Sequence, residues 1–309
     1  VKGADMFVGG SSALARNFNV PGLIIGLTIV ALGTSTPEMA VSTVAAFQGS
    51  NEIALSNVVG SNIFNLLGIL GICAIIYPLP VDGIVLKRDF PVAIITTILL
   101  LLVSCGSVLF NGHFAEYGMD REVAVVSRPV AFIFVVMFIG YIVFLVLKER
   151  KNPTDDEQTG KEPMWKCLLY IVIGLVMILV GGQVVVNCAK EIARAAGMTE
   201  TLIGLTIVAI GTSLPELVTS EVAARKGETD MAIGNVIGSN IFNLLFILGI
   251  SALIHPVSIN MASVYDLMIL VVVSGISYIF AFTSRRIARG EGILMLMIYA
   301  ADVVFAILR

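Results

Sequence analysis

The stretch that decides the fold runs from residue 25 to residue 72 and reads IGLTIVALGTSTPEMAVSTVAAFQGSNEIALSNVVGSNIFNLLGILGI. It recurs at residues 203–250, at a constant offset of 178 and without a gap, and 32 of the 48 positions are identical. Both copies carry the motif Gly-Thr-Ser-x-Pro-Glu, which ends at Glu38 and at Glu216, followed by Gly-Ser-Asn-Ile-Phe-Asn. This repeat predicts two related halves that share one site, an arrangement typical of secondary transporters.

The composition indicates an integral membrane protein. Of the 309 residues, 57% are hydrophobic and only 13% are charged, and the mean hydropathy is +0.97, whereas soluble domains average about 25% charged residues. The net charge of −3 suggests no nucleic-acid partner. Four cysteines lie in or beside apolar runs: Cys73, Cys105, Cys167 and Cys188. Their spacing matches no metal site, so we interpret them as small thiols buried in the membrane.

The apolar segments predict an all-α, polytopic membrane protein with ten transmembrane helices, five in each half, because about 20 apolar residues cross a bilayer. The expected spans are residues 3–16, 21–47, 52–77, 90–110, 123–147, 165–189, 200–225, 230–254, 264–283 and 291–308. We divide the chain into a first repeat (1–147), a linker (148–164) and a second repeat (165–309). Comparison with the sixth span predicts that the first helix begins before Val1.

Because five is an odd number, two five-span repeats must lie in the membrane in opposite orientations. With both termini outside and the central loop in the cytoplasm, 13 Lys and Arg residues fall in cytoplasmic loops and 5 fall outside. The positive-inside rule favours this orientation. The loops that follow the two motif helices fit this orientation. Phe47-Gln48-Gly49 in the first repeat is uncharged, whereas its equivalent Arg225-Lys226-Gly227 in the second repeat, which the orientation places in the cytoplasm, is basic. We therefore expect inverted repeats.

The two motif carboxylates are the strongest candidates for function. A charge in hydrocarbon costs a few kcal/mol or more, so Glu38 and Glu216 predict a functional site. The alternative, a purely structural role for both, is disfavoured by the rarity of such groups in membranes. Pro37 cannot donate a backbone hydrogen bond and its ring clashes with the carbonyl of Gly33, so we expect a broken helix there. Irregular backbone at membrane depth survives where it is buried in protein or lines a polar cavity.

The residues around each carboxylate offer oxygen atoms at helical spacing. Thr34, Ser35 and Glu38 can share one helix face, and Ser61 and Asn65 are four residues apart on another. The candidate metal ligands are the side chains of Thr34, Ser35, Glu38, Ser61, Asn65, Thr212, Ser213, Glu216, Ser239 and Asn243, with the carbonyls of Ala31 and Ala209. Hard cations prefer such oxygens, and Ca²⁺ takes about six to eight of them. The set contains no His or Cys, which argues against zinc, copper or iron.

Two asparagines and one aspartate allow more than one interpretation. Asn62 and Asn240 either form hydrogen bonds across helices or act as ligands. Asp5 corresponds to the neutral Gln183 in the second repeat, so it either pairs with Lys2 or takes part in transport.

At these motifs the chain resembles the cation/calcium exchanger superfamily, specifically its sodium/calcium exchanger branch. The Gly-Thr-Ser-x-Pro-Glu and Gly-Ser-Asn-Ile-x-Asn elements look like the two alpha-repeats of that family, and the resemblance covers essentially the whole chain. It implies one calcium site at the membrane centre flanked by sodium sites, with the twelve residues named above as ligands. It also implies that the first and sixth spans slide past the motif bundle. The short linker is typical of a minimal, prokaryote-type member.

One residue departs from the pattern of the family. Several members carry an aspartate where this chain has Asn243, so the predicted site holds two formal negative charges, from Glu38 and Glu216. Two charges balance one Ca²⁺ or two Na⁺. A third Na⁺ would need uncompensated charge, which is costly at low dielectric, or a remote carboxylate such as Asp5.

We therefore expect an antiporter that exchanges Ca²⁺ for Na⁺ by alternating access, in the inner or plasma membrane of a prokaryote. A proton-coupled calcium exchanger is the closest alternative, since two buried glutamates can also carry protons. A cation channel fits an inverted repeat with a closed centre less well. We expect no enzyme activity, because no nucleophile–base pair is evident, no cofactor other than the transported ions, and a monomer in the lipid bilayer.

Overall fold

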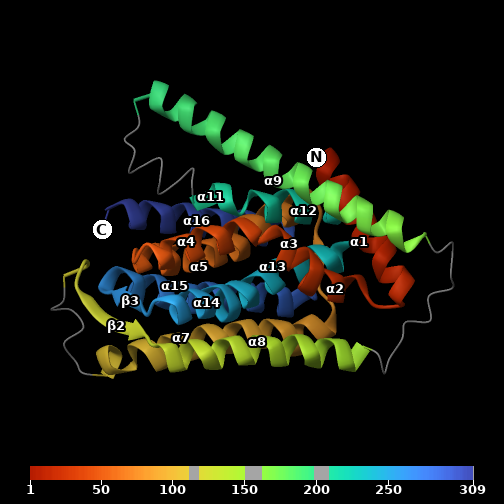
Figure 1. The fold of residues 1–309 in the computed structure, drawn as a ribbon. Helices are drawn as coiled ribbons and strands as arrows, with labels where there is room; N and C mark the ends of the chain where they lie inside the picture. Colours follow the sequence, from red (N-terminus) through yellow and green to blue (C-terminus); the bar gives the residue numbers. More distant parts are fainter. Residues whose placement is uncertain (111–117, 150–161, 198–208, 309) are drawn as a thin grey trace.

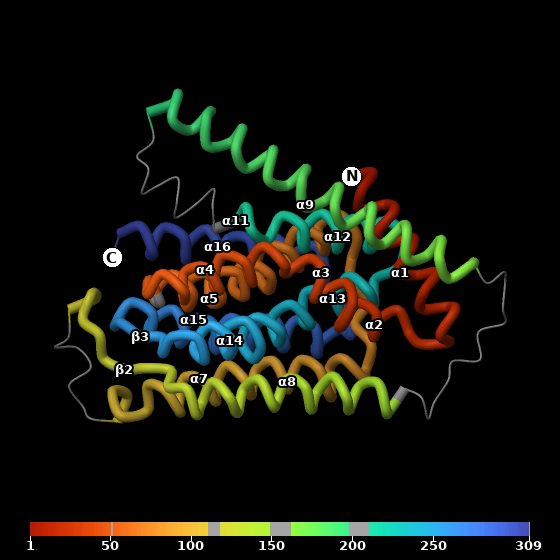
Figure 2. The backbone as a smooth tube through the Cα atoms, in the orientation of Figure 1, coloured from red at the N-terminus to blue at the C-terminus, as the bar shows by residue number. Residues whose placement is uncertain are grey.

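The structure is a computed structural model that describes residues 1–110, 118–149, 162–197 and 209–308. It is a bundle of helices that run roughly side by side, with two short strands visible at one end (Figure 1). The helical membrane fold expected from composition is confirmed. The helices that carry the motifs lie inside the bundle, and α7 (Phe90–Phe110) and α8 (Arg128–Glu149) cover one side of it (Figure 2).

The first repeat begins with α1 (Lys2–Phe18), which precedes the motif helices. The elements between α1 and α7 are, in chain order, α2 (Gly22–Ile25), the π-helical turn η1 (Gly26–Val30), α3 (Ala31–Thr34), α4 (Thr36–Phe47), α5 (Asn51–Ile63), the π-turn η2 (Phe64–Ile69), α6 (Leu70–Ile76), β1 (Leu79–Pro80) and the π-turn η3 (Val85–Asp89). Strand β2 (Glu122–Val126) separates α7 from α8.

The second repeat follows the same order. Its described elements are α9 (Met164–Ala195), α11 (Ala209–Thr212), α12 (Leu214–Arg225), α13 (Thr229–Ile241), the π-turn η6 (Phe242–Ile247), α14 (Leu248–Ile254), β3 (Val257–Asn260), α15 (Met261–Ser284), β4 (Arg286–Ile287) and α16 (Arg289–Leu308).

The strands tie the two repeats together in a pattern that reflects their inversion. β2 pairs antiparallel with β3, with Val126 opposite Val257, at the end of the bundle where the C-terminus lies (Figure 1). β1 pairs antiparallel with β4, with Leu79 opposite Ile287, at the other end. β1 and β3 occupy equivalent places in the two repeats, directly after α6 and α14. One pairing therefore closes each end of the bundle.

The membrane-spanning segments agree with the sequence in kind, but the count of ten is not confirmed. Seven described helices are long and apolar enough to cross a bilayer, and the bent pair Gly22–Thr34 and Thr36–Phe47 makes up to eight. Of the other two expected spans, α1 has 17 residues. The span expected at 200–225 lies partly outside the described residues.

Two expected boundaries were wrong. The fourth span begins at Val85 instead of residue 90, because Arg88 and Asp89 pair with each other and so enter the helix with little net charge. The fifth was expected at 123–147, but residues 122–126 form β2 and the helix begins at Arg128. Pro129 is at the first turn of that helix, where a missing N–H costs nothing.

Close helix contacts are made through glycine. A Cβ added at Gly174 of α9 would lie 2.5 Å from the backbone nitrogen of Phe7 in α1, and one at Gly292 of α16 would lie 2.7 Å from the carbonyl oxygen of Gly71 in α6. Only a residue without a side chain permits such approach. The last helix of the second repeat thus packs on the motif-bearing span of the first.

Candidate ion-binding site

The helix that carries each motif breaks at a serine. Ser35 has φ −79° and ψ 13° and Ser213 has φ −91° and ψ 9°, a conformation between the regular regions. The helical axis bends by 49° at the first of these breaks. Pro37 and Pro215 lie in the first turn of the helix that follows. The breaks expected from the prolines are therefore present, with the turning residue two positions earlier.

The carbonyls near the first break are less free than the sequence suggested. The Thr36 hydroxyl donates to the Gly33 carbonyl at 2.7 Å, and the Ser35 N–H donates to the Ala31 carbonyl at 3.0 Å. In the second repeat the N–H of Ser213 bonds to the Ile210 carbonyl at 3.2 Å. Leucine replaces Thr36 there, at position 214, so the two breaks are not chemically equivalent.

The two motif glutamates lie in one buried cluster and are held crosswise. The hydroxyl of Ser213 donates to Oε1 of Glu38 at 2.9 Å, and the hydroxyl of Ser35 donates to Oε1 of Glu216 at 2.7 Å. Each serine therefore binds the carboxylate of the other repeat. Both glutamates are 1% exposed. Neither faces lipid.

Sequence reasoning missed a second pair of asparagines that fixes the backbone of each glutamate. The side-chain N–H₂ of Asn57 donates to the Glu38 carbonyl at 3.1 Å and to the Ser42 hydroxyl at 2.9 Å. Asn235 makes the equivalent contacts to Glu216, at 3.3 Å, and to the Ser220 hydroxyl, at 2.9 Å. The sequence signal for this role is that Asn57 and Ser42 of the first repeat recur as Asn235 and Ser220 in the second.

The amides that follow lie on π-turns. Asn65 is in η2 and Asn243 is in η6, at equivalent positions. The N–H₂ of Asn65 donates to Oδ1 of Asn240 at 3.0 Å, and the N–H₂ of Asn243 donates to Oδ1 of Asn62 at 3.0 Å. Asn62 and Asn240 thus bond across the helices, which is one of the two roles left open by the sequence.

Several buried oxygens of the cluster accept no hydrogen bond from any described residue. They are Oε2 of Glu38, Oε2 of Glu216, Oγ of Ser61, Oδ1 of Asn65 and Oδ1 of Asn243. Most buried polar atoms have a partner, so a set of unpaired oxygens calls for an explanation. All five belong to candidate ligands and both repeats contribute. The described residues include no group of three or more His, Cys, Asp or Glu side chains that could hold a metal ion.

The other candidate side chains lie around this cluster. The hydroxyl of Thr34 is 3.1 Å from Oδ1 of Asn235, and the hydroxyls of Ser239 and Ser35 lie 3.0 Å apart. Thr34 and Ser239 are fully buried, whereas Thr212 is only half-buried. For Ala209 the structure describes the backbone, at the start of α11.

The model of the family described as "Sodium/calcium exchanger protein" matches residues 1–147 and 166–308. The chain belongs to the sodium/calcium exchanger family. The exchanger is 32% identical to sodium/calcium exchanger MaX1 of Methanosarcina acetivorans, over 98% of this chain and 94% of that protein. It is 37% identical to inner membrane protein YrbG of Escherichia coli K12, over 96% of this chain and 89% of that protein.

A solved structure agrees with the fold of the exchanger. The sodium–calcium exchanger NCX_Mj, soaked with Na⁺ and Sr²⁺, matches with a TM-score of 0.80 and 33% identity, covering 98% of this chain and 93% of that one. The resemblance read from the two motifs is thereby confirmed. The exchanger is an integral membrane protein of a family of cation/calcium exchangers.

The exchanger has a cavity of about 300 Å³ between the helix breaks and the C-terminal half of α9. Residues lining it include Pro37, Gln183, Lys190, Gly211, Thr212 and Pro215. That part of α9 diverges from the bundle toward the end where β2 and β3 pair (Figure 1). At the first break, a Cβ built at Gly33 would lie 3.3 Å from a side-chain carbon of Leu175 in α9 and 3.4 Å from the ring of Phe7 in α1. Thr34 at this break is fully buried, whereas Thr212 at the second break lines the cavity.

Asp5 does not belong to the cluster. Its carboxylate pairs with Lys226 at 3.1 Å, and the same ammonium donates to its carbonyl at 2.9 Å. The side chain of Asp5 is 50% exposed. The partner is therefore Lys226 and not Lys2, which was one of the two alternatives, because α1 packs against α12 and brings Asp5 to the residue that follows that helix.

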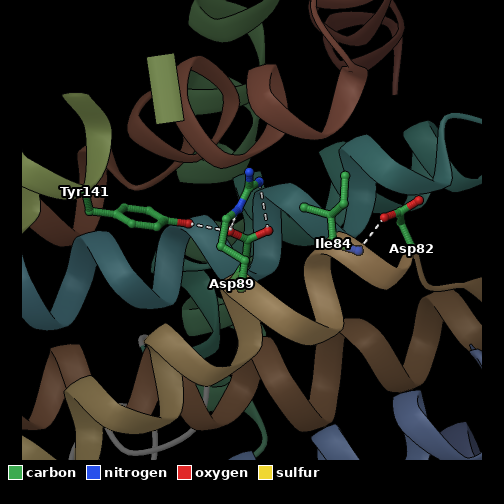
Figure 3. A network of polar contacts seen from close by, with 5 residues as sticks. Asp82, Ile84, Asp89 and Tyr141 are labelled. Carbon is green, nitrogen blue, oxygen red and sulfur yellow. Dashed lines mark hydrogen bonds and ion pairs between the residues drawn. The ribbon is translucent and has the colours of Figure 1, made fainter. Parts of the chain in front are cut away.

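A further intramembrane carboxylate, Asp89, has a structural environment (Figure 3). Its side chain is fully buried and pairs with Arg88, with Nε 2.7 Å from Oδ1 and Nη2 3.1 Å from Oδ2. The hydroxyl of Tyr141 in α8 donates to Oδ1 at 2.9 Å. Nearby, the N–H of Ile84 donates to Asp82 at 2.5 Å. Both carboxylate oxygens of Asp89 therefore accept hydrogen bonds, whereas Oε2 of Glu38 and Oε2 of Glu216 accept none from a described residue.

Proposed function

We propose that the protein exchanges Ca²⁺ for Na⁺ through one central site shared by the two repeats. The unpaired buried oxygens carry this proposal, because they come from carboxylates, amides and a hydroxyl and therefore form the ligand set that Ca²⁺ prefers. The proposed ligands are Thr34, Ser35, Glu38, Ser61, Asn65, Thr212, Ser213, Glu216, Ser239 and Asn243, with the carbonyls of Ala31 and Ala209.

The charge of the site fits an electroneutral exchange. Glu38 and Glu216 supply two negative charges, which one Ca²⁺ or two Na⁺ would balance. Asn65 and Asn243 are neutral and Asp5 is paired with Lys226. A third Na⁺ would therefore leave an uncompensated positive charge at low dielectric. We expect one Ca²⁺ to exchange for two Na⁺.

Unequal covering of the site supports alternating access. Thr34 is fully buried, whereas its equivalent Thr212 lines a cavity beside α9. In an inverted repeat, the opposite state is obtained when the two halves exchange conformations. We propose that α1 and α9 slide to cover and uncover the site in turn, and that the cavity opens to the outside, as the count of loop charges predicts.

Flux measurements test the proposal. Purified protein in sealed vesicles should take up Ca²⁺ when an outward Na⁺ gradient is imposed, and much less with a proton gradient alone. Glu216→Gln should abolish this uptake, whereas Glu52→Gln, at an exposed carboxylate on α5, should preserve it. Uptake driven equally well by protons would instead assign proton coupling. Na⁺-driven uptake by Glu216→Gln would remove Glu216 from the site.

The setting of the protein is part of the same proposal. We place it as a monomer in the inner or plasma membrane of a prokaryote, with both termini outside and no cofactor besides the ions that it moves. Its relative YrbG is named as an inner membrane protein. Labelling of Lys and Arg loops in intact cells, with a reagent that cannot cross membranes, would test the orientation.

A further inference from the structure

We propose that Asn62 and Asn240 are positioning residues that fix which end of the Asn243 and Asn65 amides faces the cation. The inference rests on the proposed cation site and goes beyond its ligands. It starts from a property of every asparagine ligand, because the side chain ends in an oxygen and an N–H₂ group of similar size, and only the oxygen can bind a cation. Without a partner for the N–H₂ group, the amide could present either end.

The structure supplies that partner crosswise. The N–H₂ of Asn243 donates to Oδ1 of Asn62, and the N–H₂ of Asn65 donates to Oδ1 of Asn240, each at 3.0 Å. The oxygens Oδ1 of Asn65 and Asn243 remain unpaired and buried. Each ligand amide is thus held by its nitrogen, so its oxygen is left for the cation.

Asn62 and Asn240 are themselves oriented by groups that can only accept. The N–H₂ of Asn62 donates to the backbone carbonyl of Asn240 at 3.2 Å, and that of Asn240 donates to the carbonyl of Asn62 at 3.4 Å. A carbonyl has no proton to donate, so each amide must direct N–H₂ toward it and oxygen away. Both residues are at most 2% exposed, so bulk water does not compete. The orientation therefore propagates from backbone to Asn62 to Asn243.

This device matters because position 243 is an asparagine here. An aspartate there would offer two equivalent oxygens, either of which could bind the cation, and would need no orientation. The contribution of Asn62 to ion binding should therefore depend on whether residue 243 is Asn or Asp. A role limited to packing would not depend on it.

A set of double-mutant cycles tests the inference on full-length purified protein, with Ca²⁺ binding measured by titration calorimetry. Loss of a group that orients a metal ligand typically weakens binding by about 10- to 100-fold, so Asn62→Ala should weaken Ca²⁺ binding by that factor. In the Asn243→Asp background most of this loss should disappear. In the Asn65→Asp background, the matched control, the full loss should remain.

The symmetric arm is independent and keeps the test valid if Asn62→Ala does not fold. Asn240→Ala keeps the backbone carbonyl that orients Asn62. This variant should bind Ca²⁺ more weakly, and Asn65→Asp should restore most of the binding whereas Asn243→Asp should not. An equal loss in all backgrounds would overturn the inference. Undiminished binding by Glu216→Gln would instead overturn the proposed site itself, so the two failures are distinguishable.

Discussion

At the scale of single residues, the site is defined by which oxygens are already bonded. Oε1 of Glu38 and of Glu216 accepts a serine hydroxyl from the other repeat, and Oε2 of each accepts no hydrogen bond from a described residue. A buried charge that lacks full compensation destabilises the fold. The carboxylates are therefore expected to cost stability when no ion is bound.

Glu216→Gln should leave the ion-free protein equally or more stable, because the substitution keeps the shape of the side chain and removes a buried charge. Thermal unfolding in detergent without Ca²⁺ or Na⁺ measures this, with Glu52→Gln as the control expected to change little. Ca²⁺ should raise the melting temperature of the wild type but not of Glu216→Gln. A strongly lowered ion-free melting temperature would indicate a structural role for the carboxylate.

Asn243→Asp should make transport more dependent on Na⁺ or on pH. Exchange of one Ca²⁺ for two Na⁺ moves no net charge, whereas a third Na⁺ would add one charge, worth about 2.3 kcal/mol per 100 mV. We expect Ca²⁺ flux by the wild type to vary little when vesicles are clamped at different potentials with a potassium ionophore. A strong voltage dependence of the wild type would show that a third cation is balanced by charge outside the described cluster.

At the scale of elements, buried polar contacts join helices that apolar packing alone would not place uniquely. The Asp89 carboxylate at the start of the fourth span binds Tyr141 of α8 and so connects that span to the next. The Asn57 and Asn235 amides similarly connect α5 to α4 and α13 to α12. Each such bond lies in a low-dielectric interior, where an unsatisfied partner is costly.

Tyr141→Phe should destabilise the protein, because it removes one of the donors to a buried carboxylate and hydrogen bonds to charged groups contribute about 1.5–3 kcal/mol. Tyr77→Phe is the matched control, since Tyr77 is 46% exposed. Unfolding of both variants is compared by thermal melting in detergent. Equal stability of the two would mean that Arg88 alone satisfies Asp89.

At the scale of the whole molecule, the motif segments of the two repeats share 32 of 48 residues but differ in their surroundings. Thr212 at the second break lines the cavity, whereas Thr34 at the first break does not. Equivalent residues therefore differ in exposure, with Thr34 fully buried and Thr212 half-buried. Such asymmetry between equivalent positions is what a single state of an alternating-access cycle requires.

In a background where the four native cysteines are replaced by serine, Thr212→Cys should react faster than Thr34→Cys with a small thiol reagent that cannot cross membranes. The reason is the cavity beside Thr212. The replacement is needed because Cys188 is exposed. Modification rates on sealed, oriented vesicles provide the measurement. Equal rates for the two positions would contradict the one-sided opening.

The sequence by itself determined the membrane class, the duplicated motifs, the helix breaks and the residues that gather in the cluster. These features follow from composition, from local backbone chemistry such as that of Pro37, and from a repeat that any alignment of the chain with itself reveals. Membership of the exchanger family followed from the same motifs and was confirmed over the whole chain.

Only the tertiary structure decided which side chains bond to one another. Ser35 binds Glu216 rather than Glu38, which is closer in sequence, and Lys226 rather than Lys2 pairs with Asp5. Asn62, open between two roles in the sequence, bonds to Asn243. Spacing along a helix fixes which residues share a face, but the partner opposite that face depends on how helices distant in sequence pack.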